Sequence, residues 1–134
     1  MGVSKITDKV YIGDQRDAKR NRNRFTIFTV AIECTFKGDY YVPIVDGLDR
    51  RNVGQLRKAV DILDQLTSMN GRVLVHCVGG ASRSPIVVAG YLMRRGMSID
   101  KALTYIKHRR EAVDPNPDLV ELLRSEIVQA QSSL

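Results

Sequence analysis

Residues 73–85 read Val73-Leu74-Val75-His76-Cys77-Val78-Gly79-Gly80-Ala81-Ser82-Arg83-Ser84-Pro85. The first three residues are apolar and predict a buried strand. Small residues, two of them glycine, follow and predict a tight loop. The apolar run 85–93 comes next and predicts a buried helix. A strand, a loop and a helix in this order are typical of an α/β unit whose loop lies at the carboxyl end of a central strand.

The loop after this strand has the composition of an anion-binding site. Its glycines allow the backbone to curl until successive N–H groups point at one bound anion, and the positive end of the next helix faces the same anion. Arg83 adds a full positive charge. In such surroundings the Cys77 thiol should ionise below its free value of roughly 8.5. The residues therefore predict a thiolate beside a bound phosphate, and transfer of a phosphoryl group to sulfur.

The segment from His76 to Ser84 resembles the signature of cysteine-dependent protein phosphatases, in which His-Cys, five residues and Arg-Ser follow one another. Its surroundings are most similar to the small dual-specificity branch. The resemblance implies that Cys77 attacks phosphorus and forms a phosphocysteine, while the Arg83 fork holds two phosphate oxygens. It also implies that Ser84 steadies the sulfur as it leaves, and that His76 orders the loop from behind. The substrate phosphate would be bound by Val78, Gly79, Gly80, Ala81, Ser82 and Arg83.

The implied reaction needs a general acid, because an alkoxide or phenoxide is expensive to expel without a proton. In dual-specificity phosphatases an aspartate follows an Ile-Pro-like strand upstream of the cysteine, and residues 41–46, Tyr-Val-Pro-Ile-Val-Asp, resemble that segment. Asp46 is therefore the expected acid, and the same carboxylate would later activate a water. Asp49 is the alternative. Either aspartate could instead only cap the helix that begins near Arg50.

Length and hydrophobic patterning predict one catalytic domain over residues 1–134. The chain has 134 residues, 43% of them hydrophobic, which is enough for a core of its own. Strands are expected at 9–13, 25–32, 40–45 and 72–75, and apolar spacing in 56–66, 99–106 and 119–127 predicts amphipathic helices. The expected fold is α/β, with a mainly parallel sheet of four to five strands flanked by helices. It is similar to the protein tyrosine phosphatase fold.

Charge and cysteine content limit which partners and which cellular compartment are expected. The formal net charge is +6, which attracts phosphorylated proteins, nucleic acid or anionic surfaces without choosing among them. Two cysteines cannot form a disulfide scaffold, and no secretory leader or membrane-spanning apolar run is present in the sequence. We expect a cytoplasmic monomer that acts on phosphorylated proteins and needs no metal, cofactor, membrane or obligatory nucleic acid.

Two features outside the motif have competing interpretations. A basic cluster is expected first to be a solvated helix face, then a substrate-docking surface, and last an RNA contact. Its members are Arg16, Lys19, Arg20, Arg22 and Arg24. Cys34 is expected to be a small buried hydrophobe, and the alternative is a reversible disulfide with Cys77. The resembled family often has an asparagine before a Gly-Phe pair at the start of the final helix. This chain keeps the asparagine as Asn116 but lacks the Gly-Phe pair, so Asn116 is not assigned a catalytic role.

Other functions remain open at this level. The nearest alternative is an RNA 5′-triphosphatase or a phosphoinositide phosphatase with the same nucleophile, although the loop has no lysine to meet extra ring phosphates. A non-catalytic phosphate-binding module is a second alternative, and the retained Cys77 and Arg83 disfavour it. A phosphatase of the low-molecular-weight type, with Asp114 as acid, is a third alternative. In phosphatases of that type the phosphate loop lies near the start of the chain, whereas here about 75 residues precede Cys77, so this alternative is disfavoured.

Overall fold

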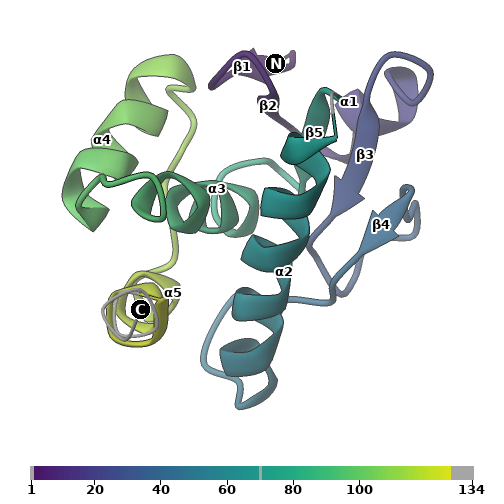
Figure 1. Cartoon of the computed structure of the whole chain (residues 1–134). Helices are drawn as coiled ribbons and strands as arrows, with labels where there is room; N and C mark the ends of the chain where they lie inside the picture. Colours follow the sequence, from purple (N-terminus) through teal and green to yellow (C-terminus); the bar gives the residue numbers. More distant parts are fainter. Residues whose placement is uncertain (1, 70, 128–134) are drawn as a thin grey trace.

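The computed structural model describes residues 2–69 and 71–127, and within them five strands form one sheet in the order β1-β2-β5-β3-β4 (Figure 1). The central strand β5 (Val73–His76) is parallel to β2 (Val10–Gly13) on one side and to β3 (Thr26–Thr29) on the other. Beyond them, β4 (Tyr40–Tyr41) is parallel to β3, and β1 (Ser4–Lys5) is antiparallel to β2. This is the mainly parallel sheet that the sequence predicts.

The register of the three central strands determines where the motif loop emerges. His76, the last residue of β5, lies opposite Gly13 of β2 and Thr29 of β3, which are also the last residues of their strands. All four residues of β5 are buried. Cys77 therefore leaves the sheet at the shared carboxyl edge of three parallel strands, the place where α/β folds bind ligands.

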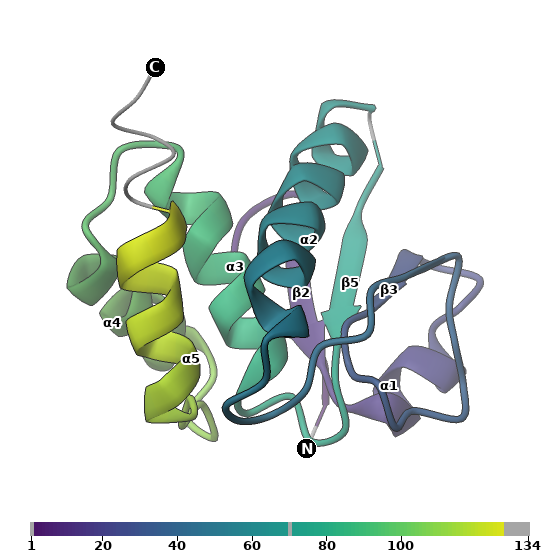
Figure 2. The same ribbon diagram turned by 90° about the horizontal axis from the view of Figure 1, so that it is seen from below.

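Helices cover both faces of the sheet. Their bounds are α1 Gln15–Arg20, α2 Arg51–Ser68, α3 Arg83–Met93, α4 Ile99–Arg109 and α5 Pro117–Leu122, followed by a π-helical turn at Leu123–Ile127. On one face, α1 buries Ala18 against Ile27 and Leu74 in a small core. The larger core lies on the other face with α2 and α3, and Figure 2 shows α1 across the sheet from these two helices.

Helix α3 is buried along its whole length, because every residue from Arg83 to Met93 is shielded from solvent. It lies between α2 and α4 (Figure 1), and its mostly apolar side chains pack against these neighbouring helices. This burial fixes the first turn of α3, which carries Arg83 and Ser84, relative to the end of β5.

Most predicted elements are confirmed, and the differences have a structural cause. The predicted strand 25–32 ends at Thr29, because its neighbour β5 ends at His76 and leaves the following residues without a continuous ladder. The predicted strand 40–45 is likewise regular only at Tyr40–Tyr41. The edge strand β1 was not predicted, since two residues carry no periodicity. The predicted domain over 1–134 includes residues 1, 70 and 128–134, which lie outside the described residues.

Side-chain caps begin two of the helices. Asp14 caps α1 by accepting from the Asp17 amide, and Asp17 returns the bond to the Asp14 amide. Ser98 caps α4 by accepting from the Lys101 amide. Among the residues that the structure describes, no helix has the length and apolar character needed to cross a membrane.

Candidate active site

Cys77 lies directly after β5 and is almost completely buried, with 2% of its surface exposed. Its Sγ lies 3.3 Å from the Oγ of Ser84, in the first turn of α3. A hydroxyl at this distance can donate to a thiolate and stabilise the negative charge on sulfur. The structure thus brings these two predicted residues into direct contact.

The backbone carbonyls of residues 77–82 all accept hydrogen bonds from the protein around the loop. The acceptor and donor atoms are Cys77 O and His76 Nδ1 (3.0 Å), Val78 O and Gln15 N (3.1 Å), Gly79 O and Arg110 Nη2 (3.5 Å), Gly80 O and Arg110 Nε (2.9 Å), Ala81 O and Asp114 N (2.8 Å), and Ser82 O and Ile86 N (3.2 Å). The carbonyls therefore point outward from the loop.

This arrangement leaves the loop amides turned inward. In a planar trans peptide the N–H of one residue points opposite to the C=O of the residue before it. The N–H groups of residues 78–83 consequently face away from the outer donors, and within residues 2–69 and 71–127 none of them donates to a protein acceptor. A ring of free backbone N–H groups is a binding site for a phosphate-sized anion.

His76 is buried behind the loop and connects it to β3. Its Nδ1 lies 3.0 Å from Cys77 O, and a carbonyl can only accept, so Nδ1 carries the proton. Its Nε2 lies 2.7 Å from the Thr29 hydroxyl, which in turn accepts from the Gly38 amide at 2.8 Å. Burial lowers the pKa of His76, which favours this neutral ring. The position agrees with the ordering role that the motif implies, because the ring contacts the loop backbone and not the thiol.

Arg83 is 4% exposed and is held by an acidic residue that the sequence did not reveal. Its Nη1 and Nη2 donate to the two carboxylate oxygens of Glu33 at 2.5 and 2.6 Å, and Nη1 also donates to Ile44 O at 2.9 Å. The hydrogen bonds from Arg83 lower the pKa of Glu33, so that it is a carboxylate at neutral pH. Glu33 thereby fixes the orientation of the arginine fork.

One edge of the same guanidinium remains free. The Arg83 Nε is buried and has no hydrogen-bond partner, and it is the one buried side-chain nitrogen or oxygen in the described part of the chain of which this is true. An unpaired buried donor is costly, so its persistence points to a ligand that completes it. The Nε and Nη2 together form the planar edge that binds two oxygens of a phosphate.

Asp46 sits at the rim of the loop and is exposed. Its Oδ1 accepts from the Ser82 hydroxyl at 2.7 Å, and the same hydroxyl oxygen accepts from the Asn116 amide at 2.9 Å. The Asn116 side chain donates to Asp46 O at 3.1 Å. Asn116 therefore links the phosphate loop, through Ser82, to the segment that carries Asp46, and it does not contact the thiol.

The segment that carries Asp46 is anchored from the other side by Asn52. This buried amide, in the first turn of α2, accepts from Val45 N at 2.9 Å and donates to Val45 O and Gly47 O at 2.8 and 2.9 Å. A satisfied buried amide of this kind holds a loop in one conformation. The Asp46 side chain is thus presented to the phosphate loop by a fixed backbone.

Asp49 has a different environment. Both of its carboxylate oxygens accept from the Arg51 side chain, at 2.8 and 2.9 Å, and one also accepts from the Arg51 amide at the start of α2. The Arg51 guanidinium lowers the pKa of Asp49 to about 2. A carboxyl with so low a pKa holds no proton to donate at neutral pH, so Asp49 is poorly suited to act as the acid.

Sequence reasoning missed Glu33, Asn52 and the positioning contacts of Asn116. Glu33 had a usable signal, since an acidic residue that follows a strand next to the cysteine strand reaches the same carboxyl edge. Asn52 and Asn116 had none, because their roles depend on which loops the tertiary fold brings together.

Cys34 and Cys77 are both free thiols, and burial raises the pKa of Cys34, as expected for a small buried hydrophobe.

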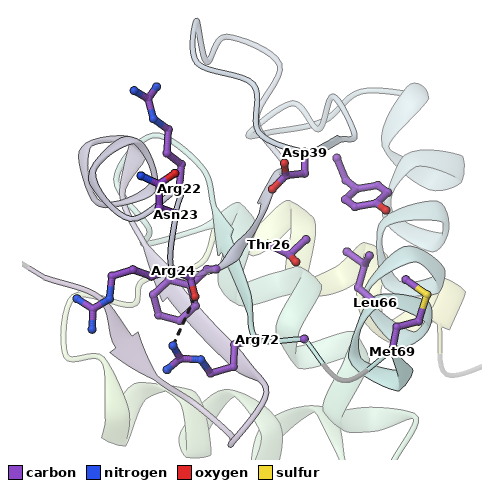
Figure 3. Close-up of a pocket in the computed structure, with 11 residues that line it drawn as sticks. Arg22, Asn23, Arg24, Thr26, Asp39, Leu66, Met69 and Arg72 are labelled. Atoms are coloured by element: carbon purple, nitrogen blue, oxygen red, sulfur yellow. Dashed lines mark hydrogen bonds between the residues drawn. The ribbon is translucent and has the colours of Figure 1, made fainter.

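A large hollow of about 580 Å³ opens at the opposite end of the sheet, next to Thr26 at the start of β3 (Figure 3). It includes none of the predicted site residues. Arg22 and Arg24 of the basic cluster line it, and both are exposed. Their guanidinium groups point outward in Figure 3. These two arginines are solvated as expected, but they follow the end of α1 at Arg20 and so do not belong to a helix face.

A glutamine at position 33 is expected to reduce kcat/KM for a phosphate ester by about 10- to 30-fold, because a neutral amide offers one acceptor oxygen to the two Arg83 donors. Steady-state kinetics on Glu33→Gln would check this. The matched control is Glu121→Gln, which removes an exposed carboxylate from a 3.8 Å pair with Arg124. Equal activity of both variants and the parent would contradict the positioning role of Glu33.

Comparison with known proteins gives consistent matches. Residues 10–127 match the family model described as dual specificity phosphatase, catalytic domain. The chain is 31% identical to human dual specificity protein phosphatase 16 over 128 residues, which is 87% of this chain and 19% of that protein. It is 42% identical to the Arabidopsis thaliana protein-tyrosine-phosphatase IBR5 over 79 residues, 58% of this chain and 31% of that protein. The chain thus spans less than a third of the length of these two relatives.

Solved structures show the same architecture. The crystal structure of human DUSP28 superposes with a TM-score of 0.83 at 23% identity, covering 96% of this chain and 95% of that one. The crystal structure of PTPMT1 superposes with a TM-score of 0.79 at 21% identity over 98% of this chain and 96% of that one. At these identities the likeness concerns the fold, and it confirms the protein tyrosine phosphatase-like sheet predicted from the sequence.

Proposed function

Because this chain belongs to the dual specificity phosphatase catalytic domain family, we propose that it hydrolyses phosphate monoesters of proteins through a phosphocysteine intermediate. The observation that carries the proposal is the set of unpaired donors around one buried thiol. The inward N–H groups of residues 78–83 and the free Arg83 Nε together offer a phosphate a set of hydrogen-bond donors that is already oriented before the phosphate binds.

In the first half-reaction the loop amides and the Nε–Nη2 edge of Arg83 bind the three non-bridging oxygens of the phosphate. The Cys77 thiolate attacks phosphorus, so that an S–P bond forms while the bond from phosphorus to the leaving oxygen breaks. Asp46 gives its proton to that oxygen, and an alcohol or phenol departs. The same donors stabilise the charge that builds up on the phosphoryl oxygens in the transition state.

In the second half-reaction a water attacks the phosphocysteine. Asp46, now a carboxylate, accepts a proton from the water as the O–P bond forms and the S–P bond breaks. Sulfur leaves as a thiolate, and the Ser84 hydroxyl at 3.3 Å donates to it. Inorganic phosphate is released, and the thiol site returns to its starting charge.

Phosphorylated proteins are the proposed substrates, with phosphotyrosine accepted and phosphoserine and phosphothreonine accepted as well. The names of the relatives support this range, since they include both dual specificity and tyrosine phosphatases. The loop residues 78–82 contain no lysine that would bind further phosphates of an inositol ring. We further propose that the catalytic unit acts as a cytoplasmic monomer without a metal, a membrane or nucleic acid.

Release of inorganic phosphate tests the proposal directly. Purified protein in the presence of a metal chelator is expected to hydrolyse an aryl phosphate and phosphotyrosine and phosphothreonine peptides. Triphosphate-ended RNA and phosphoinositides serve as the competing substrates. Preference for either of these would replace the proposed substrate class, and no turnover of any phosphate ester would leave only a phosphate-binding module.

The role of Asp46 predicts a dependence on the leaving group. Asp46→Asn is expected to lower kcat/KM by about 100-fold for phenyl phosphate but by less than about 10-fold for an aryl phosphate with an acidic phenol, which departs without protonation. Comparison of kcat/KM for the two esters checks the prediction, because kcat/KM reports on formation of the phosphocysteine and not on its hydrolysis. Asp49→Asn is the control and should leave both rates near those of the parent, because the Asp49 carboxylate pairs with Arg51. The reverse pattern would make Asp49 the acid.

A further inference from the structure

We propose that Arg110, the residue that follows α4, is a positioning residue for the phosphate loop. In this proposal it holds the carbonyls of Gly79 and Gly80, and by doing so it aims the N–H groups of Gly80 and Ala81 at the substrate phosphate. The inference rests on the proposed phosphatase function, because it assigns a residue outside the motif to the same site.

Arg110 is a buried cation whose acceptors among the described residues are all neutral. It is 2% exposed and is among the largest fully buried side chains of the described core. On the loop side, Nε donates to Gly80 O at 2.9 Å and Nη2 to Gly79 O at 3.5 Å. On the strand side, Nη1 donates to Gly2 O at 2.9 Å, Ser4 Oγ at 3.1 Å and Ile12 O at 3.3 Å. None of these five acceptor atoms belongs to a carboxylate.

A buried charge with only neutral partners is expensive, since burial usually requires an opposite charge. Simple cohesion between α4 and the strands could be supplied by apolar residues at no such cost. The cost of burying the Arg110 cation is offset if a negative charge binds on the far side of the loop. A bound phosphate dianion is such a charge, and the loop backbone lies between it and the guanidinium.

The planarity of the peptide bond links these contacts to the phosphate site. The Gly79 carbonyl and the Gly80 N–H share one peptide plane, and the Gly80 carbonyl and the Ala81 N–H share the next. Donation from Arg110 to both carbonyls turns both N–H groups to the opposite side, where the phosphate binds. Without Arg110, either plane can flip and present a carbonyl dipole to the anion, which repels it.

Gly80 shows how closely the loop lies on the guanidinium. Its φ of 69° is in the left-handed region that glycine adopts most readily. A Cβ built at this position would lie 2.6 Å from Arg110 Nη2 and 2.6 Å from Gly13 O. The loop backbone is therefore in contact with Arg110 with no side chain between them, so its conformation depends on where the guanidinium lies.

Two substitutions of Arg110 test the inference with inorganic phosphate as the probe. Arg110→Met keeps the apolar stem and removes all donors, and Arg110→Lys keeps the charge but has one amine in place of the fork. We expect the inhibition constant for inorganic phosphate to rise by about 30-fold or more in Arg110→Met and by about 5-fold in Arg110→Lys. The loss in kcat/KM for an aryl phosphate should follow the same order, with the partial rescue by lysine reporting on the retained charge.

Matched controls separate positioning from general stability. Arg109→Met alters the neighbouring exposed arginine, whose guanidinium lies over the Tyr105 ring, and should leave the inhibition constant within about 2-fold. Ser4→Ala removes one strand-side acceptor and no loop contact, and should lower only the melting temperature. Thermal unfolding identifies a temperature at which each variant is folded, and the lysine variant serves if the methionine variant does not fold.

The outcomes are distinct. A folded Arg110→Met with the parent's inhibition constant and kcat/KM would overturn the inference while leaving the phosphatase function intact. An equal loss in Ser4→Ala and Arg110→Met would also overturn it, because that result assigns Arg110 to cohesion of the strands. If the parent itself releases no phosphate, the proposed function fails first.

Discussion

Replacement of Cys77 by serine is expected to lower kcat by about 10⁴-fold or more, because a serine hydroxyl at this position has no adjacent base to ionise it and no longer provides the polarisable sulfur that attacks phosphorus. Binding should survive, since the phosphate is held by the loop amides and by Arg83. The measurement is a paired one, of phosphate release and of phosphopeptide binding by calorimetry. The variant should bind its substrate and fail to turn it over.

Cys34→Ser is the matched control for this result. Cys34 is also buried and is also a free thiol, so the same atom replacement is made in the same core. It should keep the parent's kcat and lose a modest amount of stability. If Cys77→Ser keeps more than about one hundredth of the parent's kcat, sulfur is not the nucleophile. The inactive variant would also capture phosphoproteins from the native cell and so identify the physiological substrate class.

Arg83→Lys is expected to lower kcat/KM by about 10²- to 10³-fold although the charge is conserved. A lysine amine cannot contact both carboxylate oxygens of Glu33, donate to Ile44 O and still offer a planar edge to the phosphate. Both kcat and the affinity for inorganic phosphate should fall, because the fork contacts the oxygens in the ground state and in the transition state. Steady-state kinetics and inhibition by phosphate measure the two effects.

The control for this charge-conserving change is Arg95→Lys. Arg95 is exposed, donates to Asp64 at 2.8 Å and lies over the Tyr91 ring, so it offers an arginine in an ion pair outside the site. Its replacement should change kcat/KM by less than about 2-fold. A similar small effect at Arg83 would show that charge alone is needed and that the geometry of the fork is not.

The order of residues in the chain was sufficient to predict the central strand, loop and helix of this protein. An apolar run, small residues with two glycines, Arg-Ser and a second apolar run predict strand, loop and helix, because each of these signals is local. The same local order predicts that Cys77, Ser84 and Arg83 share one loop. Asp46 was predicted through resemblance of its own segment, and the structure places it against Ser82 at 2.7 Å.

The tertiary structure alone decided how that loop is held. Glu33, Asn52, Asn116 and Arg110 come from four separate segments, and their contacts span between 5 and 108 positions along the chain. Apart from the position of Glu33 after a strand, nothing local distinguishes these residues from polar residues that lie on the surface, because their significance arises from hydrogen bonds that form only when the segments meet. The sequence therefore determined which atoms react, and the packing of distant segments decided which way the amides and the guanidinium point, since direction is a property of the folded neighbourhood and not of the residue.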